Sequence, residues 1–373
     1  MEEIKSTPTA EAQVPPAAED PAKRRIASID ALRGFDMFWI IGGAGVVKSF
    51  LRIFMDPLPK GIQKQFSHPA WEGFSAWDMI MPLFLFVVGV VMPISFGRRM
   101  EAGATKGQLY KKILIRTVIL FILGMAAQGH LLDFDLDKLH IYCNTLQAIA
   151  VGYLIAGILL INVGIIWQIA AIPVLLIAYW ALMMFVPVPG HGPGVLKPEA
   201  NLARYIDFAI LGKFQDGTTY TWILSGLGFA ATVLLGVLAG HIVKSRLKGG
   251  AKCGLLAAIG VFLLLSGWLW GWYPSPVRFP VIKHIWSSSM VLWSGGWCYL
   301  LLCLFYLIID VLGFRKWAFF FIIIGSNAIF VYMATRLFDF HKIGDIFVHG
   351  IVPHLGSFGP FVRDAAALAV IWI

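Results

Sequence analysis

The stretch that decides the fold reads FSHPAWEGFSAWDMIMPLFLFVVG, from Phe66 to Gly89. A histidine, a tryptophan and an aspartate stand at the start of a run that is otherwise almost wholly apolar. An ionised side chain at membrane depth costs roughly 2.5 to 3.5 kcal/mol on insertion scales, so it is expected to be paired, hydrated or functional. Asp78 is therefore a functional candidate inside a predicted membrane helix, and His68 lies just outside that helix.

The composition indicates an integral membrane protein. Hydrophobic residues make up 58% of the 373 residues and charged residues 14%, against roughly 45–50% and about 25% in soluble domains. Apolar segments near the ~20 residues needed to cross a bilayer recur along the chain. We expect an all-α polytopic protein with about ten transmembrane helices, in which residues 26–373 form one transmembrane domain.

The predicted spans follow from the apolar runs. They are Ala31 to Phe50, Phe74 to Phe96, Ile113 to Ala127, Asn144 to Ile161, Ile165 to Val186, Trp222 to Val243, Leu255 to Trp272, Ser287 to Leu312, Trp317 to Thr335 and Phe361 to Ile373. The last run is shorter than a normal span, so we expect it to insert partly or the natural chain to continue.

Basic residues gather in alternate loops, and short cytoplasmic loops are enriched in Lys and Arg. One set consists of Lys23, Arg24, Arg25, Arg98, Arg99, Lys106, Lys111, Lys112, Lys244, Arg246, Lys248, Lys252, Arg315 and Lys316. The opposite loops dilute their basic residues with acidic ones. The pattern predicts a cytoplasmic N-terminus and an outward-facing His68. It also accounts for the net charge of +9 through anionic lipid headgroups, without a nucleic-acid partner.

Residues 1–25 are rich in Pro, Ala and Glu and contain no apolar run, which predicts a disordered cytoplasmic tail. No cleavable signal peptide precedes the first span, so this span is expected to act as an uncleaved anchor. The cysteines show no metal-ligand spacing and are assigned to packing; they are Cys143, Cys253, Cys298 and Cys303.

The longest outward loop runs from Pro187 to Thr221 and opens with PVPGHGPG, which cannot hold a helix. A short amphipathic helix is predicted to begin after Asn201, whose side chain suits an N-cap. The segment is either a flap on the outer surface or a lid over a substrate cleft.

Several polar residues stand within or beside the spans. Arg33 and Asp36 are three residues apart and can meet on one helix face, either as a structural pair or with Arg33 holding a phosphate. The other phosphate candidates are Arg98, Lys112 and Lys244, which the positive-inside bias explains equally well. Interhelical hydrogen bonds or substrate contacts are expected from Asn144, Gln147, Ser288 and Asn327. Gly236 and Gly240 are expected to serve helix packing.

The motifs resemble those of the heparan-alpha-glucosaminide N-acetyltransferase family of transmembrane acyltransferases. The similar blocks occur in the expected order from about Arg25 onward: SIDALRGFDMFWIIGG, HPAWEGFSAWDMIMPLFLFVVG, NTLQAIAVGYL, LARYIDFAILGK, LLGVLAGHIV, KHIWSSSMVLWSGG and GSNAIFVYM. The H-x-x-W-x-G block followed by a helix aspartate is the most specific of them. The resemblance implies acetyl transfer from cytoplasmic acetyl-CoA to an amino sugar or glycan beyond the membrane, with no metal. It also implies a bacterial member in the inner membrane.

The resemblance places the family histidine on His68. A sugar amine reacts only when neutral, and histidine titrates near neutral pH, so His68 is the candidate base. A covalent acetyl-imidazole intermediate is the alternative. Asp78 is its expected partner, since Pro82 also frees the Asp78 carbonyl; the competing interpretation of Asp78 is a helix cap. Trp71 and Glu72 are substrate-binding candidates in the same block.

The chain departs from the family at two places. Known members carry an asparagine in the first helix, whereas this region reads IIGGAGVVKSF, and an arginine stands where this chain has Ala148. The segment GHLLDFDLDKLH holds a further cluster of His130, Asp133, Asp135 and His140 without an assigned counterpart.

Two other functions stay open. An amino-sugar permease would need alternating access and often shows internal repeats with broken helices; no repeat is evident here, although Pro82 and Pro93 are expected to break the second helix. An enzyme that acylates a cell-wall polymer or a lipid-linked sugar would keep the mechanism and change the acceptor. The glycine motifs are compatible with a homodimer.

Overall fold

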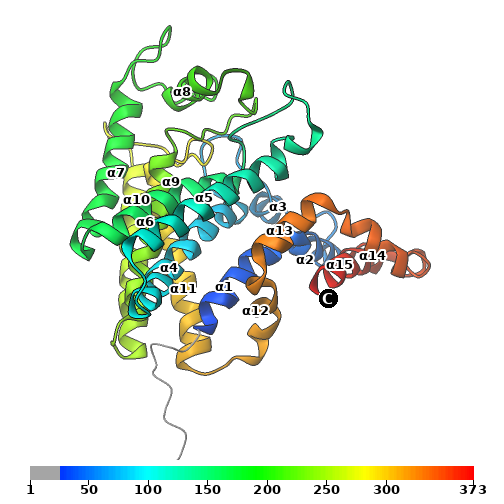
Figure 1. Ribbon diagram of the computed structural model, residues 1–373. Coiled ribbons are helices and arrows are strands. Elements are labelled where there is room, and N and C mark those ends of the chain that lie inside the picture. Colours follow the sequence, from blue (N-terminus) through cyan, green and yellow to red (C-terminus); the bar gives the residue numbers. More distant parts are fainter. Residues whose placement is uncertain (1–25) are drawn as a thin grey trace, which may run out of the picture.

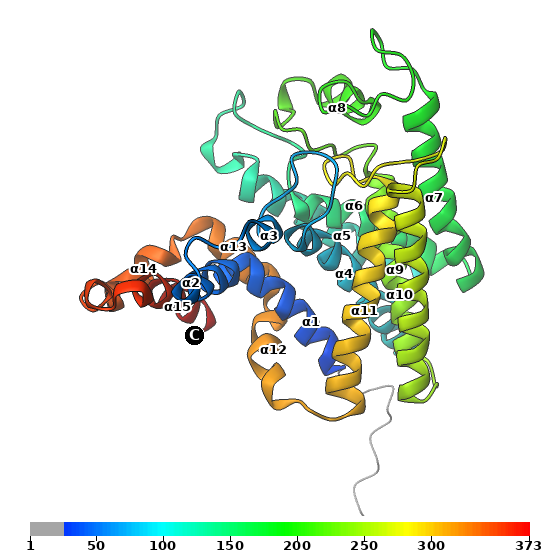
Figure 2. The same cartoon turned by 180° about the vertical axis from the view of Figure 1, so that it is seen from behind.

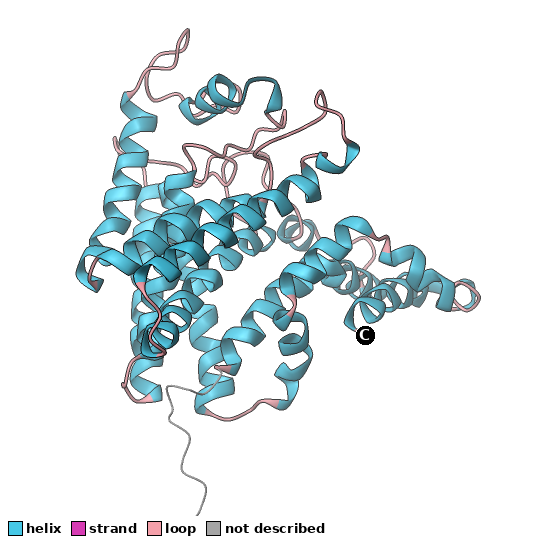
Figure 3. Cartoon of the chain, in the orientation of Figure 1, coloured by secondary structure: helices cyan, strands magenta, loops and turns pink. Residues whose placement is uncertain are grey.

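The computed structural model describes residues 26–373, and the predicted N-terminal tail lies outside them. Helices joined by loops make up this part of the chain, and only two isolated β-bridges occur in it (Figure 3). The all-α prediction is confirmed for the described residues.

Every predicted span is helical. The longer helices are α1 (Ala27–Phe38), α2 (Ala44–Phe54), α4 (Ile80–Glu101), α5 (Lys106–Gln128), α6 (Thr145–Asn162), α7 (Ile165–Phe185), α9 (Gly226–Lys244), α10 (Gly249–Gly271), α11 (Ser288–Tyr306), α13 (Ala328–Leu337) and α15 (Gly359–Trp372). The shorter ones are α3 (Lys60–Gln65), α8 (Leu202–Leu211), α12 (Phe319–Ser326) and α14 (Phe340–Val348).

Seven of the helical segments in residues 26–373 are long and apolar enough to cross a membrane, and the α12–α13 pair would make an eighth. This pair bends by 65° at Asn327. The two other predicted spans, now α5 and α15, are not among the helices that could cross a membrane. Basic residues occupy the first half of α5, and α15 has only 14 residues. The structure is that of a multi-pass membrane protein.

The first and second predicted spans show how local chemistry shapes a helix. A π-helical turn from Trp39 to Gly43 joins α1 to α2, where Gly42 has φ 125°; only a glycine adopts this φ readily. The predicted breaks at Pro82 and Pro93 are wrong, because α4 is continuous from Ile80 to Glu101. Pro82 lies in the first turn, where a helix has no use for the missing N–H group.

Helices α4 and α9 form the centre of the bundle through close backbone contact. A Cβ atom added to Gly236 would lie 2.0 Å from the Phe86 carbonyl oxygen, and one at Gly240 would lie 2.3 Å from the Val90 oxygen. Gly89 faces Val233 in the same way. Gly236 and Gly240 thus serve helix packing, as the sequence predicted.

The predicted pair of Arg33 and Asp36 does not form. Arg33 Nη1 points to the Gly325 carbonyl oxygen at 3.5 Å, toward α12. Asp36 is buried, and neither of its carboxylate oxygens has a hydrogen-bond partner within the described residues. The spacing of three residues would allow an ion pair between them. Instead, Arg33 is directed toward α12, and Asp36 lies beside α4 and α11.

The bundle has two distinct ends (Figure 1). Helix α8 and the long loops lie at one end, here called the outer end, and a separate buried cluster that includes Leu202, Tyr179 and Phe279 packs beneath α8. The start of α1 and the α9–α10 and α11–α12 loops lie at the opposite, inner end, as Figure 2 also shows. These inner segments belong to the basic set of the sequence analysis.

Replacing Gly236 by alanine should destabilise the protein by about 1–3 kcal/mol, because the new Cβ cannot fit against the Phe86 carbonyl without moving α4 from α9. The matched control is Gly254→Ala in α10, where no atom lies within 4 Å of the added Cβ and the change should be neutral or slightly stabilising. Thermal unfolding of both purified variants measures the difference. Equal melting temperatures would contradict the packing described here.

Candidate functional site

The turn before α4 holds Asp78 in a fixed position. Ser75 and Asp78 form a capping box around the short 3₁₀ turn Ala76–Met79. The Asp78 Oδ2 atom accepts hydrogen bonds from the Ser75 backbone N–H at 2.9 Å and from the Ser75 hydroxyl at 3.0 Å. This cap occupies one carboxylate oxygen and leaves Oδ1 for another partner.

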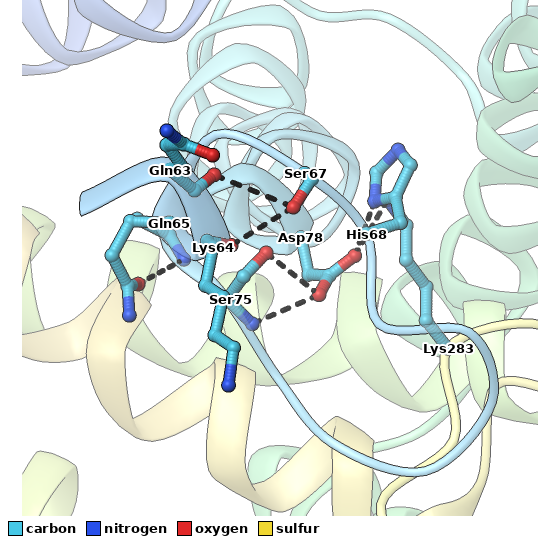
Figure 4. Close-up of polar contacts among 9 residues, drawn as sticks. Gln63, Lys64, Gln65, Ser67, His68, Ser75, Asp78 and Lys283 are labelled. Atoms are coloured by element: carbon cyan, nitrogen blue, oxygen red, sulfur yellow. Dashed lines mark hydrogen bonds and ion pairs between the residues drawn. The ribbon is translucent and has the colours of Figure 1, made fainter. Parts of the chain in front are cut away.

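That partner is His68. Its Nδ1 atom lies 2.5 Å from Asp78 Oδ1, and Figure 4 shows the second ring nitrogen directed away from the carboxylate. The Asp78 side chain is fully buried, whereas 37% of the His68 side chain is exposed. The helix-cap interpretation and the histidine-partner interpretation of Asp78 therefore both describe its contacts, one through each oxygen.

A lysine completes the cluster. Lys283 Nζ lies 3.3 Å from Asp78 Oδ1 and 3.3 Å from His68 Nδ1. A nitrogen that approaches a carboxylate oxygen at 2.5 Å must carry the proton, so Nδ1–H donates to Asp78 and Lys283 donates to the same oxygen. When the imidazole is neutral, this tautomer leaves Nε2 unprotonated. Within residues 26–373, Nε2 has no hydrogen-bond partner.

Lys283 was not among the sequence candidates. It lies in the loop between α10 and α11, 215 residues from His68. The available signal was that Lys283 is the first residue of the block KHIWSSSMVLWSGG. Burial lowers the pKa of Lys283, while the Asp78 carboxylate beside it acts in the opposite direction. A buried cation thus compensates a buried anion behind the histidine.

His68 and Lys283 line a cavity of about 370 Å³, here called the site cavity. Its other walls are Ile40, Trp77, Ile80, Met81, Phe84, Gln128, Cys143, Thr145, Leu146, Ile149, Asp216, Thr218, Tyr220, Trp222, Tyr332 and Arg336. The long outer loop contributes Asp216, Thr218 and Tyr220. This loop is therefore part of the cavity wall.

A second cavity of about 280 Å³ borders the first. It is called the arginine cavity because Arg33 and Arg116 line it, together with Val88, Leu120, Ser326, Asn327, Ala328, Ile329 and Phe330. Phe84, Leu146 and Ile149 line both cavities. Arg33 lies in the first turns of α1, so the arginine cavity extends toward the inner end. Arg116 and Arg336 were not predicted, because neither stands in a motif.

Five of the six predicted substrate-binding residues, all but Asn327, line neither cavity. The Trp71 indole donates to the Leu196 carbonyl, and Glu72 pairs with Arg278 at 2.9 Å. The Ser288 hydroxyl donates to the Leu176 carbonyl, and the Gln147 carbonyl oxygen accepts the Cys143 and Asn144 N–H groups. These contacts hold loops and helix ends in place.

The remaining two behave differently. Asn144 caps α6 and donates to the hydroxyl of Tyr332 at 3.0 Å, so it supports a residue of the site cavity. Asn327 lines the arginine cavity at the bend between α12 and α13.

The cofactor candidates also separate. Arg33 lines the arginine cavity. Arg98 lies near the end of α4, Lys112 near the start of α5 and Lys244 at the end of α9, and all three lie outside both cavities. Lys244 pairs with Glu101 at 3.4 Å. In the outer cluster His130 pairs with Asp133 at 3.0 Å. The described residues contain no group of three side chains placed to hold a metal ion.

Two curated proteins are similar to this chain. The heparan-alpha-glucosaminide N-acetyltransferase of Homo sapiens is 25% identical over 373 residues, which cover 84% of this chain and 53% of that protein. The enzyme of the same name from Mus musculus is 24% identical over 332 residues, with 74% and 49% covered. The chain thus spans about half the length of the curated relatives it matches. No family model matches it.

His284, next to Lys283 in the same loop, makes the stability of the folded protein depend on pH. Burial, with Lys283 and His68 nearby, lowers its pKa from 6.5 to about 4. Because the unfolded chain binds this proton near pH 6.5 and the folded protein only near pH 4, the stability that neutral His284 contributes is lost as the pH falls through this range. The His284→Gln variant should therefore lose less melting temperature between pH 7.5 and 5 than the unmodified protein. The exposed His349→Gln is the control, and identical pH profiles for all three proteins would contradict the assignment.

Proposed function

We propose that this protein is a membrane-bound N-acetyltransferase that moves an acetyl group from acetyl-CoA on the inner side to an amine on the outer side. The observation that carries the proposal is the His68–Asp78–Lys283 cluster at the wall of a cavity that borders a second, arginine-lined cavity. The similarity to heparan-alpha-glucosaminide N-acetyltransferases supports the choice of reaction.

His68 is the proposed base. Asp78 holds the imidazole through Nδ1, which leaves Nε2 as the proposed proton acceptor. A histidine suits this step because its proton exchange falls near neutral pH. Asp78 is fully buried and touches His68 rather than the cavity contents, so it acts as a positioning residue.

The transfer can follow two routes from this geometry. In the direct route, Nε2 removes a proton from the amine as its nitrogen attacks the thioester carbonyl; the C–S bond then breaks and the imidazolium returns the proton to the thiolate of CoA. In the covalent route, Nε2 attacks the thioester carbonyl, and the C–S bond breaks so that the CoA thiolate leaves. The amine then attacks the acetyl-imidazole, the bond from the acetyl carbon to Nε2 breaks, and the proton lost by the amine passes through Nε2 to the thiolate. Initial-rate kinetics with both substrates varied separate them, since only the covalent route gives ping-pong behaviour.

The donor would reach the histidine through the arginine cavity. Arg33 and Arg116 there are suited to phosphate groups, because a guanidinium binds phosphate through two parallel hydrogen bonds. The shared walls Phe84, Leu146 and Ile149 mark the way from this cavity to the site cavity. A thin pantetheine arm, with its thioester at the tip, fits such a passage.

The acceptor would bind in the outer part of the site cavity. The aromatic residues Tyr220 and Trp222 line it, as do Asp216 and Thr218. The Asp216 carboxylate already accepts hydrogen bonds from the Thr218 hydroxyl and the Trp222 indole, so an amine would be a further donor to it. Aromatic rings beside hydrogen-bonding groups suit a sugar, and a carboxylate suits its amine. An amino sugar or an amine-bearing glycan is therefore the proposed acceptor class.

Replacing His68 by alanine should reduce acetyl transfer to glucosamine by at least 100-fold, because no other base is positioned at Nε2. Binding of acetyl-CoA should stay within about threefold, since the proposed phosphate contacts lie in the other cavity. Calorimetry of the purified protein measures binding, and chromatography of the product measures transfer. His130→Ala, which changes an exposed outer histidine, is the matched control.

Full transfer by the His68→Ala variant would contradict the mechanism. Sugar binding without any binding of CoA species would instead favour the permease. Among the helices of residues 26–373 that could span a membrane, one pair is sharply bent at a short break, whereas a permease often has broken helices in matching halves.

Replacing Lys283 by methionine should lower kcat/KM about 10–100-fold and move the acid limb of the pH–rate profile to higher pH. The reason is that an uncompensated Asp78 carboxylate favours the protonated imidazole, which cannot act as the base. Lys283→Arg keeps the charge and should restore most of the activity and the original profile. The account would be contradicted if Lys283→Met left the pH–rate profile unchanged and lowered kcat/KM by the same factor as Lys283→Arg. Lys283 would then have only a packing role.

A further inference from the structure

A third cavity lies between α1, α4 and α11, outside the proposed reaction path. It encloses about 480 Å³ and is here called the membrane cavity. Its walls are Phe35, Asp36, Trp39, Gln65, Phe66, Phe74, Ser75, Ala76, Trp77, Met79, Ile80, Leu83, Trp293, Trp297 and Leu301. Only Trp77 and Ile80 also line the site cavity. The two spaces thus lie on opposite sides of the first turn of α4.

One wall of this cavity reaches the surface of a helix that could span the membrane. Trp297 in its wall is 41% exposed and belongs to the membrane-spanning segment Ser288–Val311. The wall residues Trp293, Trp297 and Leu301 follow one another at helical spacing along α11. At a rise of 1.5 Å per residue they extend the cavity over roughly 12 Å, which suits an elongated apolar molecule that enters from the bilayer.

One wall residue conflicts with a purely apolar ligand. Asp36 is 1% exposed, and neither carboxylate oxygen has a hydrogen-bond partner within the described residues. The lining contains no lysine, arginine or histidine. A buried carboxylate without a partner is unfavourable in its ionised form, and a cation that pairs with it makes this form more favourable. The protein does not supply this cation from the cavity wall.

The rest of the wall suits a cation as well. The aromatic residues Phe35, Trp39, Trp293 and Trp297 line the same space, and a cation is attracted to an aromatic face most strongly when it is removed from water. A carboxylate among aromatic rings is the chemistry that recognises an ammonium group. The remaining wall, with Leu83 and Leu301, accommodates an apolar body.

We propose that the membrane cavity binds a lipophilic amine, with its ammonium group at Asp36 and its apolar chain along α11 and α4. A neutral chain of the same length would leave Asp36 unpaired and should bind less tightly. This site is separate from the acetyl-transfer site, and the proposal holds whether or not the protein transfers acetyl groups.

The test measures saturable binding of radiolabelled dodecylamine at pH 7 to the full chain in phosphatidylcholine nanodiscs, with empty nanodiscs as the blank for partition into lipid. Asp36→Asn keeps the shape of the side chain and should weaken binding at least tenfold. Leu301→Trp fills the cavity and should also abolish saturable binding. Asp364→Asn removes a carboxylate outside the cavity and should leave binding unchanged.

Unlabelled dodecanol, the neutral analogue, should compete at least tenfold less well than unlabelled dodecylamine. Three results would overturn the proposal. They are the absence of saturable binding, equal binding by the Asp36→Asn variant, and equal competition by dodecanol and dodecylamine. Thermal unfolding of each variant in the same nanodiscs confirms that it is folded before its binding is compared.

Discussion

The Asp78 carboxylate is the interaction on which the rest of the site depends. It is fully buried at the start of a membrane helix, where an unpaired anion would be expensive. Four hydrogen-bonding atoms resolve this problem: the backbone N–H and hydroxyl of Ser75 bind one oxygen, and His68 and Lys283 approach the other. The same contacts that stabilise the anion fix the tautomer of His68. Folding and chemistry are therefore linked through one side chain.

The surrounding helices give this group its setting. Close contact between α4 and α9 places the start of α4 at the bottom of the outer loops, next to the loop that carries Lys283. The site cavity lies on one side of this turn and the membrane cavity on the other. His68 and Lys283 line the site cavity and Asp36 lines the membrane cavity, inside a bundle that is otherwise apolar. Ionisable residues within membrane-spanning proteins are usually found where they bind a ligand or take part in function.

Much of the architecture could be predicted because the bilayer limits what a spanning segment can be. Apolar runs located every membrane helix, and the spacing from His68 to Asp78 correctly suggested their contact. The π-turn at Gly42 and the bend at Asn327 escaped prediction, since both depend on how neighbouring helices pack. Lys283 and Arg116 were missed for a similar reason: their partners are far away in the sequence. Arg33 and Asp36 illustrate the opposite error, in which favourable helix spacing suggested a pair that tertiary packing does not form.

The most direct test uses sealed vesicles that contain the reconstituted protein, with labelled acetyl-CoA inside and glucosamine outside. If the arginine cavity and the site cavity form one path past His68, labelled N-acetylglucosamine should appear outside while CoA stays inside, and transfer should stop when the donor is placed on the acceptor side alone. Product that forms only when donor and acceptor share one compartment would contradict a path across the membrane.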